Sequence, residues 1–245
     1  MLVTGGTRGI GRGIAEAFLE AGAQVAVGGR KPPDAPLAAG GDNAIFVAAD
    51  IRDPEQATRL VEQAASELGG LDIVVNNAGG SPPAEAATAS PRFSTAILAL
   101  NLTAPLLVAQ AANRIMQAQP QGGVIINIAS VSGLRPSPGT AVYGAAKAGL
   151  LSLTTSLAVE WAPRVRLNCV TPGLVETELA HLHYGDADAQ ARVAATVPAG
   201  RLATPGDIAR AVLFLASGEA SYISGANLVV HGGGERPAFI DAAKP

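Results

Sequence analysis

The sequence is poor in the residues that bind metals and form crosslinks. Its 245 residues include one cysteine, Cys169, and three histidines, His181, His183 and His231. A single thiol excludes an intramolecular disulfide and a cysteine-based metal site, and it is typical of cytosolic chains, so we expect a cytoplasmic protein. The histidines lack accompanying ligands at the spacing of a zinc site, so we expect no bound metal.

Charged residues are scarce as well. They make up 15% of the chain, against 48% hydrophobic residues, and the formal net charge is −3 at pH 7. The high apolar content excludes an intrinsically disordered chain. A mildly acidic sequence without a basic run does not favour a nucleic-acid partner.

One stretch without charge, residues 93–113, raises the question of a membrane span. Spanning a bilayer takes about 20 mostly apolar residues. This stretch includes Asn101, Pro105 and Gln110, and polar groups are costly in lipid. We therefore predict a buried helix and no membrane partner. The N-terminal residues Met1 to Thr4 do not have the pattern of a signal peptide.

Short apolar runs rich in Val and Ile alternate with helical stretches along almost the whole chain. Such runs are typical of strands covered on both faces, and the alternation predicts a parallel sheet with right-handed crossovers. We predict an α/β fold: a single-domain Rossmann-type three-layer sandwich with a seven-stranded parallel sheet, spanning residues 1–245. The predicted strands are 2–4, 24–28, 44–48, 72–75, 124–128, 166–170 and 227–230. The predicted helices are 10–21, 54–68, 91–119, 141–161 and 205–216.

Two segments interrupt this alternation. Residues 31–42 include three prolines and are predicted to form a loop. Residues 174–200 have no clear strand, and long loops inside compact domains are often functional. We predict that residues 174–200 form a lid over the substrate.

A glycine cluster connects the first predicted strand to the first predicted helix, in the sequence Thr4-Gly5-Gly6-Thr7-Arg8-Gly9-Ile10-Gly11. Glycines allow the backbone to turn tightly and approach a pyrophosphate, and the helix N-terminus offers free N–H groups to the anion. The spacing departs from the G-x-G-x-x-G fingerprint, but its position between a strand and a helix favours a dinucleotide phosphate site over a plain turn. The predicted contacts are Gly5, Thr7, Arg8, Gly9, Ile10 and Gly11.

The end of the second predicted strand indicates which dinucleotide binds. An Asp or Glu there would bind the ribose 2′-hydroxyl of NAD, but the sequence is Gly28-Gly29-Arg30-Lys31. The guanidinium of Arg30, helped by Arg8, matches a 2′-phosphate through bidentate hydrogen bonds. We therefore favour NADP(H) over NAD(H). The alternative is that both arginines are solvated and either cofactor binds.

Further motifs follow in order along the chain. They are Asn76-Asn77-Ala78-Gly79, Asn101, Ser130, Tyr143-Gly144-Ala145-Ala146-Lys147, Pro172-Gly173-Leu174-Val175-Glu176-Thr177, Arg201 to Ile208, and Ala220 to Gly225. Together with the glycine turn, these motifs resemble the short-chain dehydrogenase/reductase family in its single-domain form. The resemblance implies an oxidoreductase that transfers a hydride between a nicotinamide cofactor and a carbonyl or alcohol.

Four residues of these motifs are the predicted catalytic set. Tyr143 and Lys147 lie four apart on a predicted helix, so their side chains share one face. A nearby ammonium stabilises a phenolate, so we expect it to lower the pKa of Tyr143 towards a range useful for acid–base catalysis. Ser130 follows a predicted strand, where its hydroxyl can stabilise charge on a substrate oxygen. The resemblance implies that Tyr143 transfers the proton and that Asn101 holds a water in a relay behind Lys147. The alternative for Asn101 is a structural bond to backbone.

The resemblance also implies contacts to the adenosine, ribose and carboxamide of the cofactor. Lys147 would bond the nicotinamide ribose, and Thr177 the carboxamide. The implied contacts are Asp50, Ile51, Asn77, Gly79, Tyr143, Lys147, Pro172, Gly173, Val175 and Thr177.

The substrate is less closely defined by the sequence. The overall pattern resembles the family's 3-oxoacyl-carrier-protein reductases, which usually place basic residues near the end of the long helix before the fifth strand and in the lid. This chain has Gln117, Gln119 and Gln121 at the first place and His181 at the second, so steering of an acidic carrier would be weak. We therefore predict a free small-molecule carbonyl or alcohol, with an acyl thioester or carrier-linked substrate as the alternative. The family's enoyl reductases carry six residues between their Tyr and Lys, and this chain carries three.

A noncatalytic NADP(H)-binding regulator is the alternative from another functional class, and the complete catalytic set argues against it. The stretch 93–113 and the helix 141–161 would have little to keep them soluble if exposed. The resemblance suggests that these helices pair across a two-fold axis, so we expect a homo-oligomer, either a dimer or a tetramer.

Overall fold

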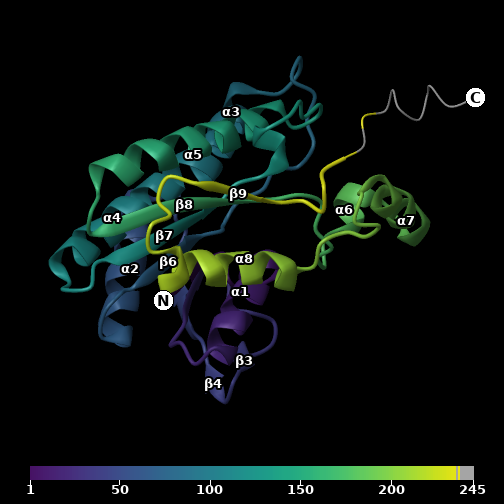
Figure 1. Ribbon diagram of the computed structural model, residues 1–245. Coiled ribbons are helices and arrows are strands. Elements are labelled where there is room, and N and C mark those ends of the chain that lie inside the picture. Colours follow the sequence, from purple (N-terminus) through teal and green to yellow (C-terminus); the bar gives the residue numbers. More distant parts are fainter. Residues whose placement is uncertain (236, 238–245) are drawn as a thin grey trace, which may run out of the picture.

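A sheet of seven parallel strands forms the centre of the computed structural model, which describes residues 1–235 and 237 (Figure 1). The strand order is β5-β2-β1-β6-β7-β8-β9. The strands are β1 (Leu2–Thr4), β2 (Ala26–Gly29), β5 (Ile45–Ala48), β6 (Ile73–Asn76), β7 (Gly123–Ile128), β8 (Val165–Pro172) and β9 (Asn227–Val230). The predicted Rossmann-type α/β fold with a seven-stranded parallel sheet is confirmed.

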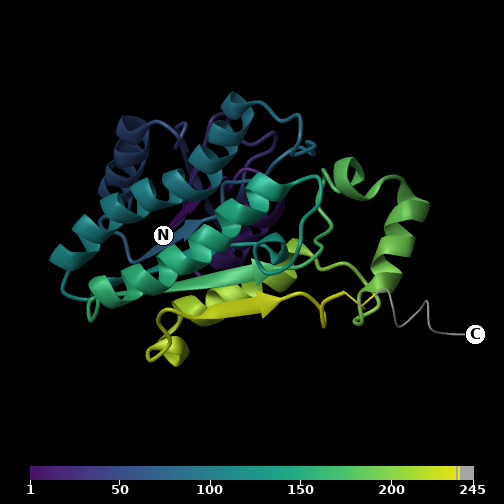
Figure 2. The ribbon, with the colours of Figure 1, turned by 90° about the horizontal axis from the view of Figure 1, so that it is seen from above.

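Helices cover both faces of this sheet, and Figures 1 and 2 show the two helical layers. They are α1 (Gly9–Glu20) and α8 (Pro205–Ala216) on one face, and α2 (Pro54–Leu68), α4 (Ala104–Ala118) and α5 (Ala141–Glu160) on the other. Each face has its own buried core. Ile14 and Val212 pack with Val27 beneath α1 and α8, while Leu60 and Met116 belong to the opposite core.

The strand order places the site. The chain runs from β1 outward to β2 and β5, returns to β6 on the other side of β1, and then continues to β9. The order therefore reverses between β1 and β6. In open α/β sheets, ligands bind outside the carboxyl ends of the strands at such a switch point.

Helix α2 illustrates how local sequence sets a boundary. The carboxylate of Asp53 accepts hydrogen bonds from the Glu55 and Gln56 backbone N–H groups, and Pro54 is the first helical residue. Gly69 ends the helix with a φ of 70°, a conformation that costs glycine little. The predicted helix 54–68 is confirmed.

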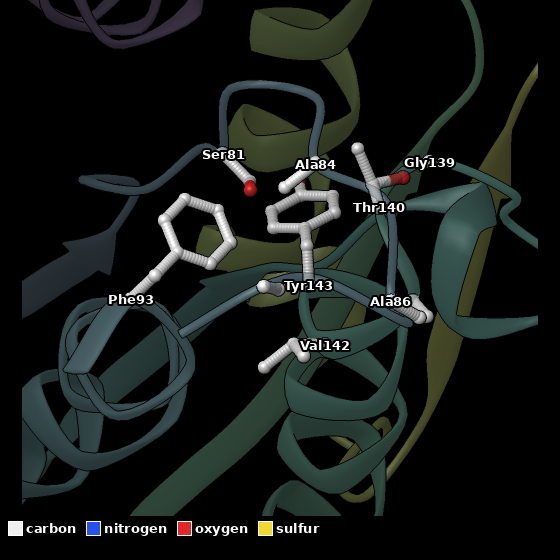
Figure 3. Close-up of a pocket in the computed structure, with 10 residues that line it drawn as sticks. Ser81, Ala84, Ala86, Phe93, Gly139, Thr140, Val142 and Tyr143 are labelled. Atoms are coloured by element: carbon white, nitrogen blue, oxygen red, sulfur yellow. The ribbon is translucent and has the colours of Figure 1, made fainter. Parts of the chain in front are cut away.

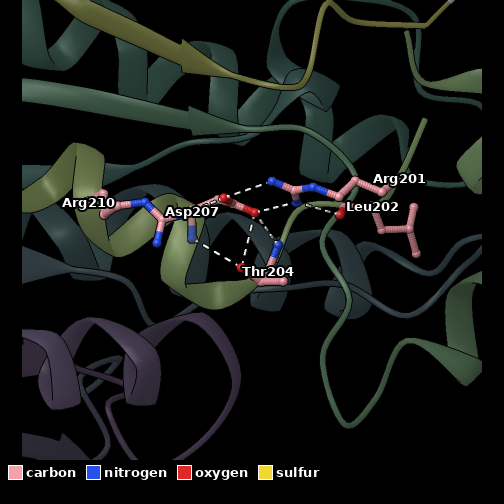
Figure 4. Close-up of polar contacts among 5 residues, drawn as sticks. All are labelled: Arg201, Leu202, Thr204, Asp207 and Arg210. Atoms are coloured by element: carbon pink, nitrogen blue, oxygen red, sulfur yellow. Dashed lines mark hydrogen bonds and ion pairs between the residues drawn. The ribbon is translucent and has the colours of Figure 1, made fainter. Parts of the chain in front are cut away.

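Helix α8 begins with a capping box, drawn in Figure 4. The Thr204 hydroxyl accepts from the Asp207 N–H at 3.3 Å, and the Asp207 carboxylate accepts from the Thr204 N–H at 2.8 Å. The same carboxylate accepts from Arg201 Nη1 at 2.6 Å and bonds to Arg210. The hydrogen bonds from Arg201 and, after it, from Thr204 hold the pKa of Asp207 well below its ordinary value.

An Asp207→Ala variant is expected to lose about 1 kcal/mol of unfolding free energy at pH 7, since capping networks contribute roughly 0.5–2 kcal/mol. Because the folded pKa is depressed, this contribution is present above about pH 4 and is lost as the pH falls. Urea unfolding of both proteins at pH 7 and in acid measures the difference. Glu62→Ala, on the exposed side of α2, is the control. An equal difference in unfolding free energy between the two proteins at both pH values would contradict the role of the ionised carboxylate.

The predicted helix 91–119 is divided into α3 (Pro91–Leu98), a π-helical turn (Ala99–Thr103) and α4. The combined helix Pro91–Ala118 and helix α5 are long and apolar enough to cross a membrane by length and composition alone. In this fold both pack into one layer, and α3 and the π-turn contact α5. In the most apolar 18-residue stretch of each helix, 44% is buried in Pro91–Ala118 and 39% in α5.

Two predicted loops include regular structure. Residues 31–42 lead into a short antiparallel pair, β3 (Ala38–Ala39) and β4 (Asp42–Asn43), joined by Gly40 and Gly41 at φ of 62° and 93°. The segment 174–200 includes α6 (His181–Tyr184) and α7 (Ala187–Thr196). Neither helix has a buried residue, so the sequence has no apolar face that would have indicated them.

Candidate functional site

The residues that the sequence singles out converge on one edge of the sheet, where the parallel strands end. The glycine turn follows β1, and Asn77 and Gly79 follow β6, so these two segments meet at the switch point. The remaining segments flank them: Arg30 after β2, Asp50 and Ile51 after β5, Ser130 after β7, and Pro172 and Gly173 at the end of β8.

The glycine turn requires glycine for steric reasons. Gly5 and Gly9 have φ of 64° and 54°. A Cβ on Gly5 would lie 2.9 Å from Ala78 Cα, and one on Gly11 would lie 2.3 Å from Asn77 Nδ2. Side chains at these positions would fill the cradle or push β6 away, so the backbone stays open to a large ligand.

Asn77 and Thr4 hold this turn in shape. The Asn77 Nδ2 donates to the carbonyl oxygens of Thr4 and Gly5 at 3.0 and 3.1 Å. The Thr4 hydroxyl accepts from the backbone N–H groups of Asn77 and Ala78, both at 3.1 Å. Sequence reasoning did not identify Thr4 as a site residue, although it immediately precedes the glycines.

The N-terminus of α1 accepts an anion. Helix α1 begins at Gly9, whose backbone N–H donates to the two carboxylate oxygens of Glu178 at 3.1 and 3.4 Å. Thr177 lies beside the same glycine, with its Cγ2 3.6 Å from the position of a Cβ. A negative group at this point is favourable because it meets free N–H groups and the positive end of the helix dipole. No sequence motif indicated Glu178, apart from its place next to Thr177.

Cationic side chains surround the outer end of the turn. Arg8 and Arg30 are exposed. Asp50 accepts from Arg52 Nε at 2.9 Å, and this pairing lowers the pKa of Asp50, with a smaller contribution from the charge of Arg30. Ile51 is buried beneath them. Arg52 therefore adds a guanidinium to this group, and no sequence motif indicated it.

Helix α5 aims Tyr143 and Lys147 at the end of β7. Lys147 is buried, its Nζ donates to the Ile128 carbonyl at 2.8 Å, and it lies 5.7 Å from the centre of the Tyr143 ring. Burial lowers the pKa of Lys147 to about 8, because the ammonium has lost most of its hydration.

The pKa of Tyr143 lies above its ordinary value, because burial disfavours the phenolate, while the Ser130 hydroxyl acts in the opposite direction. The expectation that Lys147 lowers this pKa overall is therefore wrong for the protein chain by itself. Ser130 is the N-cap of a short 3-10 turn and its Oγ accepts from the Ser132 N–H at 3.2 Å. The contribution of Ser130 to the pKa of Tyr143 places both hydroxyls in one site.

Asn101 is fully buried within the π-helical turn. Its Nδ2 donates to the Ile97 and Gly80 carbonyls at 2.9 and 3.0 Å, and its Oδ1 accepts from the Gly80 N–H at 2.8 Å. A Cβ on Gly79 would lie 2.7 Å from Asn101 Oδ1 and 3.3 Å from Lys147 Nζ. The Asn101 side chain thus fixes the loop after β6 beside Lys147. Its relay role stays a prediction.

Two cavities lie beside the predicted catalytic residues. One of about 10 Å³ lies beside Tyr143, and Figure 3 shows the tyrosine ring directed towards the loop that carries Ser81 and Ala84. It is too small for a substrate. The other, about 220 Å³, is lined by Val131 next to Ser130, by Gly173 next to Pro172, and by Val197 from the segment 174–200. Within residues 1–235 and 237, no group of three metal-ligating side chains occurs.

Comparisons with known proteins match nearly the whole chain. A family model described as "Enoyl-(Acyl carrier protein) reductase" matches residues 5–235. A 3-oxoacyl-[acyl-carrier-protein] reductase of Vibrio cholerae is 40% identical over 235 residues, 95% of each chain. An L-rhamnose 1-dehydrogenase (NAD(P)(+)) of Azotobacter vinelandii is 36% identical over 243 residues, again 95% of each chain. The crystal structure of a short-chain type dehydrogenase/reductase from Mycobacterium marinum superposes with a TM-score of 0.87 at 36% identity, over 96% of this chain and 95% of that one.

Proposed function

Since the chain belongs to the short-chain dehydrogenase/reductase family, and is thus an oxidoreductase acting on CH–OH and C=O groups, we propose that it is NADP(H)-dependent and interconverts a small-molecule carbonyl and alcohol. The proposal rests on the placement of Tyr143, Lys147 and Ser130 at the carboxyl ends of the parallel strands. They lie at the same edge of the sheet as the glycine turn, where the N-terminus of α1 binds the Glu178 carboxylate. The cradle and the anion-accepting N–H groups fit a dinucleotide diphosphate.

Each member of the set has a proposed task. When bound, the nicotinamide supplies or accepts the hydride. Tyr143 donates a proton to the carbonyl oxygen during reduction, and Ser130 donates a hydrogen bond to the same oxygen. Lys147 bonds the ribose and, with Asn101, supplies protons to Tyr143. The residues proposed to hold the cofactor are Gly5, Thr7, Arg8, Gly9, Ile10, Gly11, Arg30, Asp50, Ile51, Asn77, Gly79, Tyr143, Lys147, Pro172, Gly173, Val175 and Thr177.

The preference for NADP(H) rests on Arg30. Replacing it in an Arg30→Ala variant is expected to weaken NADPH binding about 10- to 100-fold, since hydrogen bonds to charged groups contribute about 1.5–3 kcal/mol. NADH binding is expected to change little. Fluorescence titration with both cofactors measures this, with Arg92→Ala as an exposed control. Tighter binding of NADH than NADPH by the unmodified protein would contradict the assignment.

A 3-oxoacyl-carrier-protein reductase is the second candidate, favoured by the 40% identity to such an enzyme of Vibrio cholerae. Against it, the amides at the end of α4 are engaged within the fold. Gln117 donates to the Trp161 carbonyl at 2.9 Å and Gln119 to the Leu71 carbonyl at 3.1 Å. NADPH oxidation with an acetoacetyl thioester, alone and on a carrier protein, tests this candidate, because a carrier-dependent rate would support it.

We further propose the organisation that this activity needs. The chain would act as one NADP(H)-binding domain with residues 174–200 as its substrate lid, in a cytoplasmic dimer or tetramer. The single cysteine, Cys169, is buried and unpaired, which suits a reducing compartment. The half-buried apolar helices Pro91–Ala118 and Ala141–Glu160 offer the surface for a two-fold interface.

A further inference from the structure

The larger cavity beside Ser130 has an apolar wall and a polar end. Val131 and Leu134 contribute aliphatic surface from the 3-10 turn after β7, and Leu174 and Val197 from the lid. The polar end is formed by Arg135, which directly follows Leu134, and by His231 and Glu235 from the C-terminal segment. A substrate whose reacting carbon lies at Ser130 and Tyr143 would extend its body along the apolar wall.

The polar end consists mainly of an ion pair. Arg135 Nη2 bonds to Glu235 Oε1 at 2.5 Å, and Arg135 Nη1 donates to the Pro136 carbonyl at 3.0 Å. The two side chains remain about one-third exposed, at 38% and 33%, so both face space that a ligand can enter. The pair also joins the segment after Ser130 to the C-terminal segment, 100 residues away.

A phenol of the lid, that of Tyr184, lies near this end. Burial raises the pKa of Tyr184 in helix α6, and the charges of Glu235 and Arg135 act on that pKa in opposite directions. Tyr184 therefore lies within reach of both members of the pair. Tyr184 also affects the pKa of Tyr143, so it lies near the reacting phenol as well.

The charge balance of this end discriminates among ligand groups. Arg135 and Glu235 neutralise each other. A carboxylate would be repelled by Glu235 unless it broke the ion pair, and an ammonium would be repelled by Arg135. A hydroxyl both donates and accepts, so it can bond to the carboxylate and to a free guanidinium N–H while the pair stays intact.

We propose that this cavity selects carbonyl and alcohol substrates that combine a hydrophobic body with an uncharged hydroxyl group at the end far from the reacting carbon, held by Arg135 and Glu235. This inference rests on the proposed function and assigns its substrate class. It makes Glu235 the residue that rejects carboxylate-bearing analogues.

A matched set of ketones tests the inference. Cyclohexanone, 4-hydroxycyclohexanone and 4-oxocyclohexanecarboxylate share a ring and a carbonyl and differ in the distal group. With NADPH, kcat/KM is expected to be at least tenfold higher for the hydroxyl compound than for either of the others. In Glu235→Gln, the kcat/KM for the carboxylate compound divided by that for the hydroxyl compound is expected to rise at least tenfold, because Arg135 is then free to bind the carboxylate. Glu62→Gln is the control, and its ratio is expected to stay that of the unmodified protein.

The outcomes separate the inference from the proposed function. Turnover of all three ketones at similar kcat/KM, or an unchanged ratio in Glu235→Gln, overturns the inference and leaves the proposed function standing. A preference for the carboxylate compound in the unmodified protein also overturns it, since the pair then opens for an anion. Absence of both NADPH binding and ketone turnover overturns the proposed function, and the inference with it.

Discussion

A Tyr143→Phe variant is expected to lose ketone reduction by about 10²- to 10⁴-fold in kcat, the range that a positioned general acid contributes. Its affinity for NADPH is expected to stay close to that of the unmodified protein, since the ring remains and only the hydroxyl is removed. Steady-state kinetics and fluorescence titration of NADPH measure the two quantities separately.

The matched control is Tyr222→Phe, because the side chain of Tyr222 is fully exposed far along the chain from the site. Equal activity of both variants would contradict the role of Tyr143 as acid and base. Strong NADPH binding by a protein that reduces no carbonyl, with or without Tyr143, would instead support the noncatalytic regulator.

The elements that the sequence predicted well are those set by local chemistry. Asp53 and Pro54 set the start of α2 and Gly69 sets its end, and the structure uses all three. The strand β9 matches its predicted bounds because its apolar run stands between clear turn residues. The gathering of site residues at one edge also follows from the fold, since parallel strands place their carboxyl ends together.

The features that the sequence did not predict depend on distant contacts. The bond between Gly9 and Glu178 joins residues 169 apart, and that between Arg135 and Glu235 joins residues 100 apart. Nothing in either local sequence indicates its partner. The same limit explains the pKa of Tyr143. The spacing to Lys147 predicted an ammonium nearby, but burial is a property of the packed fold and has the larger effect.

Lys147 carries a stability cost that its chemistry explains. Its ammonium is buried, and burial lowers its pKa to about 8. Among the described ionisable groups, no carboxylate is a main cause that offsets this shift. Replacing a buried charge with an apolar side chain of similar length removes this penalty. A Lys147→Met variant is therefore expected to be more stable than the unmodified protein at pH 7 by about 2 kcal/mol, allowing for the lost bond to the Ile128 carbonyl. The same variant is expected to lose at least about 10²-fold in kcat, because in the proposed mechanism Lys147 supplies protons to Tyr143.

The pH dependence distinguishes this explanation from better packing of methionine. In the unfolded chain a lysine titrates near pH 10.4, and in the folded protein Lys147 titrates at about 8. Below pH 8 the ammonium is present in both states, so the folded protein bears the whole penalty. As the pH rises from about 8 towards 10.4, the folded protein has released its proton while the unfolded chain retains it, so the unmodified protein gains stability. The advantage of Lys147→Met, measured by urea unfolding, is therefore expected to be largest near neutral pH and to shrink steadily above pH 8. An advantage that is constant with pH would assign the gain to packing, and a less stable variant at pH 7 would show that the ammonium is paired in solution.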